Sequence, residues 1–137
     1  MSKLIMIDDN PMEHLIMQKM FDRYQLFPNA THSTDGQAII EFLKKNRLNT
    51  AALPDLIFLD LNMPRCSGFD FLEQFEKLYL SFHKPVSIYI TSSSIDENDR
   101  QRTLSYQFVK EFLTKPVRKD KLVQIYVTYF KTNRKAG

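Results

Sequence analysis

The chain has 137 residues, a formal net charge of +3 and one cysteine. This length suits a single domain over residues 1–137 that buries about two-thirds of its unfolded surface. No apolar run approaches the roughly 18 residues of a membrane-spanning helix and no secretory leader is recognisable, so we expect no membrane partner. Because the lone Cys66 cannot form an internal disulfide, we expect a cytoplasmic protein in a reducing compartment.

Basic residues concentrate toward the C-terminal end of the chain. From residue 110 onward, eight lysines and arginines stand against two acidic residues, and residues 131–137 read as a short basic tail. A solvated, basic helix end explains this pattern more simply than a nucleic-acid site does. We therefore expect no direct binding of nucleic acid.

Short apolar runs alternate along the chain with stretches of helical periodicity. The strand-like runs cover residues 3–7, 26–32, 56–60, 86–90 and 109–113. The helix-like stretches cover residues 11–24, 35–46, 69–80, 96–105 and 118–130. The run at residues 56–59 is apolar throughout, as in a strand buried on both faces, so five successive strand–helix units predict an α/β domain with a parallel sheet.

Local cues set several of these boundaries and suggest a docking surface. Asn10 and Thr34 suit the N-caps of the first two helices, and Pro28 suits an edge strand. In the first helix, periodicity directs five apolar residues toward the core: Ile16, Met17, Met20, Phe21 and Tyr24. Leu15 points the opposite way. We therefore predict that a partner docks on Leu15 together with His14 and Gln18.

Polar residues stand at the carboxyl ends of four predicted strands, which parallel strands present at one edge of a sheet. The first strand ends in Asp8 and Asp9, the third in Asp60, the fourth in Thr91 and the fifth in Lys115. Crowded carboxylates repel unless a cation lies among them, and a few hard oxygen donors suit Mg²⁺. Their combination with a hydroxyl and an ammonium group predicts a phosphoryl site with a carboxylate nucleophile.

Taken singly, each of these residues also has an ordinary structural explanation. Asp8 or Asp9 could be an acid at the start of a helix, Thr91 could simply end a strand, and Lys115 before a proline could be a solvated turn residue. The joint arrangement at four strand ends favours the functional interpretation.

At this point the motifs carry a family resemblance. In order and spacing, the chain resembles the receiver domain of two-component response regulators, of the stand-alone chemotaxis type. The matching segments are IDDN at residues 7–10, LDLNMP at 59–64 with Gly68 following, ITS at 90–92 and FLTKP at 112–116. The resemblance implies a flavodoxin-like, doubly wound sheet of strand order 2-1-3-4-5, with helices on both faces.

The resemblance also implies roles for individual residues. Asp60 would accept a phosphoryl group from a sensor histidine kinase or a histidine phosphotransfer protein, with Lys115 contacting that group. Asp9, Asp60 and the backbone carbonyl of Asn62 would bind Mg²⁺ directly, and Asp8 would bind it through a water.

Further residues would tune and transmit the phosphorylated state. Thr91 and Phe112 would be the switch residues, and Phe112 should favour an inward position because its ring has no hydroxyl to hydrogen-bond. Asn62 and Ser93 would tune the phosphoryl lifetime. The domain would catalyse only its own phosphorylation and dephosphorylation, and the downstream protein target stays open.

Two departures from the family pattern stand out. Phe108 occupies the position near the last strand where many members carry glycine; a left-handed phenylalanine would be strained, so we expect another turn shape there. The residues after 130 are too few for an output domain, so the chain would be a stand-alone receiver or part of a longer regulator.

Three other functions remain open from the sequence. A haloacid-dehalogenase-type phosphatase also uses an aspartate nucleophile with Mg²⁺, but its acids are spaced Asp-x-Asp, and position 62 is asparagine here. An FMN-binding flavodoxin shares the fold, but Asp8 and Asp9 would repel its phosphate. A receiver-like interaction module that works without phosphorylation is the third alternative.

Overall fold

The computed structural model describes residues 3–64 and 66–136, with side chains as far as residue 130. The strands are β1 (Leu4–Ile7), β2 (Thr31–Ser33), β3 (Leu56–Asp60), β4 (Ser87–Ser92) and β5 (Val109–Thr114). The helices are α1 (Pro11–Tyr24), α2 (Gly36–Lys45), α3 (Gly68–Leu78), the 3₁₀ turn η1 (Tyr79–Ser81), α4 (Glu97–Leu104) and α5 (Lys119–Ala136).

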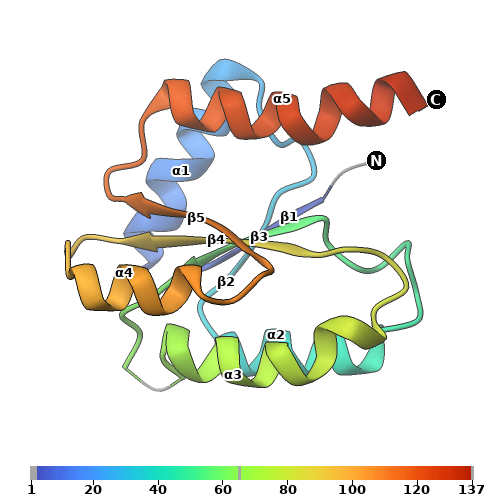
Figure 1. Ribbon diagram of the computed structural model, residues 1–137. Coiled ribbons are helices and arrows are strands. Elements are labelled where there is room, and N and C mark those ends of the chain that lie inside the picture. The colour runs from blue at the N-terminus through green and yellow to red at the C-terminus, as the bar shows by residue number, and fades with distance from the viewer. Residues whose placement is uncertain (1–2, 65, 137) are drawn as a thin grey trace.

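The strands form one parallel, five-stranded sheet of order β2-β1-β3-β4-β5, which confirms the predicted topology. Figure 1 shows α1 and α5 on one face of the sheet and α2 and α3 on the other. In this order the step from β1 to β2 runs along the sheet in the opposite direction from the steps β2 to β3 and β3 to β4. Because the crossovers between parallel strands are right-handed, α1 lies on the opposite face from α2 and α3.

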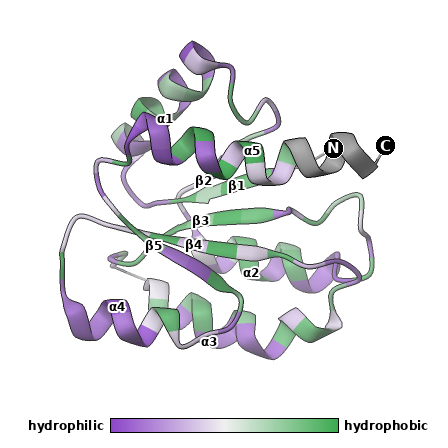
Figure 2. Ribbon diagram, turned by 45° about the horizontal axis from the view of Figure 1, so that its top comes forward, coloured by the Kyte–Doolittle hydropathy of each residue, from purple (hydrophilic) through white to green (hydrophobic). Residues whose placement is uncertain are grey.

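The core divides into two clusters because successive residues of a strand point to opposite faces. In β3, Leu56 and Phe58 pack under α1 and α5, whereas Ile57 and Leu59 pack under α2 and α3. All four are fully buried. Figure 2 shows the central strands as the most continuous hydrophobic part of the fold, and α4 as largely hydrophilic. Burial on both faces explains why β3 reads as an unbroken apolar run.

The predicted second strand was wrong over most of its length. β2 has only three residues, because the chain turns at Gln25 and Phe27, which have φ values of 55° and 46°. Leu26 and Phe27 are buried as core residues of this loop rather than as strand residues. The edge position expected from Pro28 is confirmed, since β2 pairs with β1 alone.

Helix boundaries differ from the predictions most clearly in three places, and the other boundaries agree within one residue. Asp35, not Thr34, caps α2, because its carboxylate accepts a hydrogen bond from the N–H of Ala38 at 3.1 Å. α3 ends at Leu78 and continues as η1. α5 does not end at residue 130: residues 131–136 continue the helix, since no glycine or proline precedes Gly137.

Two further predictions concern single positions. Asn10 caps α1 as predicted, accepting a hydrogen bond from the N–H of Met12 at 3.0 Å. Among the described residues other than glycine, positive φ occurs at Gln25 and Phe27 but not at Phe108, so the turn before β5 has a different shape from a glycine turn, as expected. No helix in the described ranges is long and apolar enough to cross a membrane.

Candidate functional site

The carboxyl ends of β1, β3, β4 and β5 bring the predicted site residues together. Asp8 and Asp9 follow β1, Asp60 ends β3, and Thr91 lies beside Asp60 in the register of β4. Lys115 follows β5, and the Lys115–Pro116 peptide bond is cis. Residues from all four ends line one cavity of about 410 Å³.

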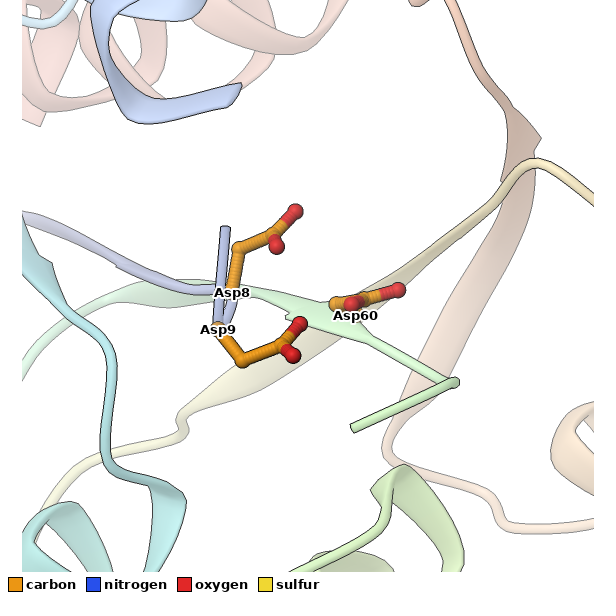
Figure 3. A group of neighbouring side chains, drawn as sticks. All are labelled: Asp8, Asp9 and Asp60. Atoms are coloured by element: carbon orange, nitrogen blue, oxygen red, sulfur yellow. The ribbon is translucent and has the colours of Figure 1, made fainter. Parts of the chain in front are cut away.

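The three aspartates offer carboxylate oxygens that lie within 4.8 Å of one another. Figure 3 shows their side chains at the ends of two neighbouring strands, with Asp8 and Asp9 reaching toward Asp60. Asp8 and Asp60 are buried, at 1% and 4% exposure, whereas Asp9 is exposed. Hard oxygen donors in this number, open to solvent on one side, fit Mg²⁺ with several bound waters.

Lys115 supplies the positive charge opposite these acids. Its ammonium group donates a hydrogen bond to Oδ2 of Asp8 at 2.8 Å and lies 3.4 Å from Oδ1 of Asp60. The backbone N–H of Lys115 donates to the carbonyl of Ser92 at 2.8 Å, which fixes the turn that carries the side chain. The ammonium group therefore contacts both buried carboxylates in this state.

The electrostatics of the site disfavour an ionised Asp60. Burial raises the pKa of the Asp60 carboxyl and the charge of Asp8 raises it further, which outweighs the opposing effect of Lys115 and of the N–H of Asn62. Burial alone would lower the pKa of Lys115, but its hydrogen bond to Asp8 and the charge of Asp60 raise it overall. A further cation among the acids would relieve the cost of the Asp60 charge.

A hydrogen bond joins Asn62, in the loop after β3, to Ser92, the last residue of β4. The side-chain amide of Asn62 donates to the Ser92 hydroxyl at 3.2 Å, and the Asn62 N–H faces Oδ1 of Asp60 at 3.3 Å. The buried Ser92 hydroxyl also bonds the backbone of Ser94, donating to its carbonyl and accepting from its N–H, each at 3.1 Å. The sequence analysis included Ser92 only in the ITS motif at residues 90–92 and assigned it no role, because a serine at the end of a strand has no distinctive pattern.

The remaining predicted residues line the cavity or lie near it. Thr91 is 3% exposed and lines the cavity, and exposed Ser93 does so as well. Phe112 is half-buried and packs against the core cluster under α2 and α3, and its expected preference for an inward position stays a prediction. Its role as a switch stays a prediction.

The predicted docking residues occupy a separate, shallow cavity of about 520 Å³ on α1 and β2. Leu15 is 57% exposed, as predicted, and Gln18 is half-buried. His14 is not an open surface residue as the docking prediction required. It is 9% exposed, Nε2 of its ring hydrogen-bonds the Asp8 carbonyl, and its Nδ1 lies 2.7 Å from Nδ1 of His32. Helical periodicity could not reveal this partner on β2. On that strand, burial and the neighbouring His14 lower the pKa of His32.

Gly68 is a second residue whose role the sequence analysis missed. It was noted only as part of a motif, yet it lies directly against the end of β3. A Cβ atom at this position would lie 2.6 Å from Cα of Leu61 and 3.0 Å from the carbonyl oxygen of Asp60. The absence of a side chain at Gly68 therefore lets α3 approach the strand end that carries Asp60.

Comparison with known proteins agrees with this geometry. The family model described as "Response regulator receiver domain" matches residues 4–127. The probable methanogenesis regulatory protein FilR2 of Methanothrix harundinacea is 26% identical over 114 residues, covering 83% of this chain and 72% of that protein. The 3′,5′-cyclic-nucleotide phosphodiesterase regA of Dictyostelium discoideum is 25% identical over 120 residues, which are 88% of this chain but 14% of that protein.

A solved structure supports the fold independently. The crystal structure of a two-component response regulator from Cytophaga hutchinsonii superposes with a TM-score of 0.81 at 20% identity, covering 93% of this chain and 95% of that one. Since the family model covers most of the chain, this protein belongs to the response regulator receiver domain family, which implies a part in phosphorelay signalling.

Proposed function

We propose that this domain accepts a phosphoryl group on Asp60 from a phosphohistidine and changes its protein-binding surface in response. The observation that carries the proposal is the convergence of three carboxylates within 4.8 Å, with the ammonium group of Lys115 against two of them. A nucleophilic carboxylate, a site for a divalent cation and a fixed ammonium group are the parts that phosphoryl transfer to aspartate requires.

The donor set fits Mg²⁺, and Asp9, Asp60 and the backbone carbonyl of Asn62 would hold it directly, with Asp8 acting through a water. When bound, the ion neutralises charge on the phosphoryl oxygens. The raised pKa of Asp60 supports this assignment, because an ionised nucleophile at this buried position needs a compensating cation.

The chain's own residues perform the remaining chemistry. An Asp60 carboxylate oxygen attacks phosphorus, the phosphorus–nitrogen bond to the donor imidazole breaks, and the departing imidazole takes a proton from solvent. Lys115, now bonded to Asp8 and near Asp60, moves its ammonium group onto a phosphoryl oxygen. Hydrolysis removes the group again: water attacks phosphorus, the phosphorus–oxygen bond to Asp60 breaks, and inorganic phosphate leaves the restored carboxylate. The domain turns over only its own phosphoaspartate and is not an enzyme for external substrates.

The switch would involve the residues that line or border the cavity. Thr91 is placed in β4 beside Asp60, so its hydroxyl can reach a phosphoryl oxygen, and Phe112 would follow by turning further inward. Such contacts exist only in the phosphorylated state and therefore bias a two-state equilibrium. Asn62 and Ser93, at the rim of the cavity, would tune how fast water reaches the phosphoryl group.

The partners would be a sensor histidine kinase or a histidine phosphotransfer protein, and a downstream protein. The exposed Leu15 on α1, beside Gln18, supports docking of the phosphohistidine protein near the cavity. His14 would contribute only its ring edge, since it is buried.

Intact-mass analysis after incubation with acetyl phosphate tests the proposal. With Mg²⁺ present, we expect one hydroxylamine-labile phosphoryl adduct on the wild type and none on Asp60→Asn or in a chelator. Asp55→Asn, at the opposite end of β3, is the matched control and should keep the adduct. An adduct that persists in Asp60→Asn would contradict the assignment. No adduct even with a panel of phosphorylated histidine proteins would favour a phosphorylation-independent interaction module.

A further inference from the structure

Two histidines lie face to edge between α1 and the edge strand β2. Nδ1 of His14 and Nδ1 of His32 are 2.7 Å apart, and their rings meet at 84° with centroids 4.8 Å apart. His14 is buried at 9% exposure, while His32 is exposed. The proposed phosphoryl chemistry uses neither ring.

The hydrogen-bond partners fix the protonated nitrogen of His14. Nε2 of His14 lies 2.8 Å from the backbone carbonyl oxygen of Asp8. A carbonyl oxygen only accepts, so Nε2 carries the hydrogen. In the neutral ring, Nδ1 of His14 then presents a lone pair.

A chain of two side chains fixes His32 in the same way. The amide nitrogen of Gln18 donates to Oδ1 of Asp22 at 2.8 Å, and a carboxylate can only accept. The amide oxygen of Gln18 therefore faces Nε2 of His32, at 2.8 Å, and that nitrogen must donate. Nδ1 of neutral His32 consequently presents a lone pair as well.

Two lone pairs cannot form a hydrogen bond with each other, so the 2.7 Å contact between two neutral rings needs either a shared proton or a metal ion between them. We propose that His14 and His32 form a second metal site, which takes a divalent transition-metal ion such as Zn²⁺ through both Nδ1 atoms. Metal-bound histidines habitually donate their other ring N–H to a carbonyl or carboxylate, and both rings here already donate to carbonyl oxygens.

The geometry requires only a small adjustment. Two Zn–N bonds of about 2.05 Å at a tetrahedral angle place the nitrogens about 3.3 Å apart, so the rings would separate by about 0.6 Å. His32 is on a short edge strand with an exposed side chain, which leaves room for that movement. The shallow cavity of about 520 Å³ beside the pair admits the waters that complete the coordination.

The site differs in chemistry from the acidic cluster. Imidazole nitrogens favour borderline ions such as Zn²⁺, Ni²⁺ and Cu²⁺, whereas the carboxylates of Asp8, Asp9 and Asp60 favour Mg²⁺. Excess Mg²⁺ should therefore occupy the site formed by the three aspartates and leave the imidazole pair free to bind Zn²⁺. The ion would lie beside Leu15, within the proposed docking surface.

Calorimetric titration of Zn²⁺ into the untagged full chain, with Mg²⁺ in excess, tests this site. We expect one Zn²⁺ per chain, and at least tenfold weaker binding in His32→Ala. The matched control is His83→Ala, which removes the third and exposed histidine of the chain and should change the affinity less than twofold.

A second measurement avoids substitutions. In long-range ¹H–¹⁵N spectra of the wild type, Zn²⁺ should shift the Nδ1 resonances of both His14 and His32 together. Three results would each overturn the proposal. Zn²⁺ affinity could be unchanged in His32→Ala, or it could fall equally in His83→Ala. The spectra could also show a proton shared between the two rings and no effect of Zn²⁺.

Discussion

Replacing Gly68 by alanine should destabilise the domain and impair the site at once. The added Cβ would lie 2.6 Å from Cα of Leu61, against 3.4 Å for an ordinary contact, so α3 and the end of β3 must separate by about 0.8 Å. Overpacking of this kind costs about 1–3 kcal/mol. Because the nearest obstructing atom, Cα of Leu61, belongs to the backbone, no side-chain rotation relieves the clash.

Gly36 provides the matched control, since it is also buried and also begins a helix. A Cβ there would meet only side-chain atoms, at 3.5 Å and beyond. Gly36→Ala should therefore be neutral or gain about 0.4–1 kcal/mol by restricting the unfolded chain. The two variants should differ by about 2 kcal/mol in the free energy of unfolding.

Urea denaturation monitored by circular dichroism measures this difference, and a thermal scan should separate the two midpoints by roughly 6 °C. Acetyl phosphate should also label Gly68→Ala more slowly than Gly36→Ala, because the displaced strand end carries Asp60. If Gly68→Ala is as stable as Gly36→Ala, the close approach of α3 to β3 is not a constraint and the reasoning fails.

Three further predictions follow from the site and its surroundings. Without Mg²⁺, Asp60→Asn should unfold at a higher temperature than the wild type in thermal scans. Since the folded pKa of Asp60 is raised, this difference in stability should grow as pH rises through that pKa and should vanish well below that pKa. Saturating Mg²⁺ should reduce the difference. Leu15→Asp should slow phosphotransfer from the cognate phosphohistidine protein at least tenfold in a radiolabel assay, whereas Leu80→Asp, which alters a residue that is 82% exposed on η1, should not. In urea denaturation, Ser92→Ala should lower the free energy of unfolding by about 1 kcal/mol, because the substitution leaves the hydrogen-bond partners of Ser92 unpaired. The control Ser93→Ala, at an exposed position, should change the free energy of unfolding by less than about 0.5 kcal/mol.

The sequence predicted best those features that depend on strand pattern. An apolar run that ends in a single acid identified β3 and Asp60, and the other strand ends then followed from the parallel arrangement. The prediction was poorer where a contact between distant segments of the chain determines whether a side chain is buried. His14 lies on the polar side of its helix by periodicity, yet His32 on β2 covers it.

Local propensity also failed where a loop is apolar. Leu26 and Phe27 have the composition of a strand, but the left-handed conformation at Gln25 turns the chain, and both side chains enter the core from a loop. The close contact of Gly68 with Leu61 could not be predicted either, because the sequence does not show which backbone segment a residue will approach in the fold.

The two outer strands of the sheet have a consequence for behaviour at high concentration. An open strand edge is a template for pairing with another copy of the chain, and long flat edges promote aggregation. Here β2 offers only three residues, and β5 carries the exposed Lys110 and a Glu111–Lys121 ion pair at 2.8 Å, next to an irregularity in its pairing with β4. A sheet with one short edge and one charged, irregular edge should resist growth into fibrils even when many copies are crowded together.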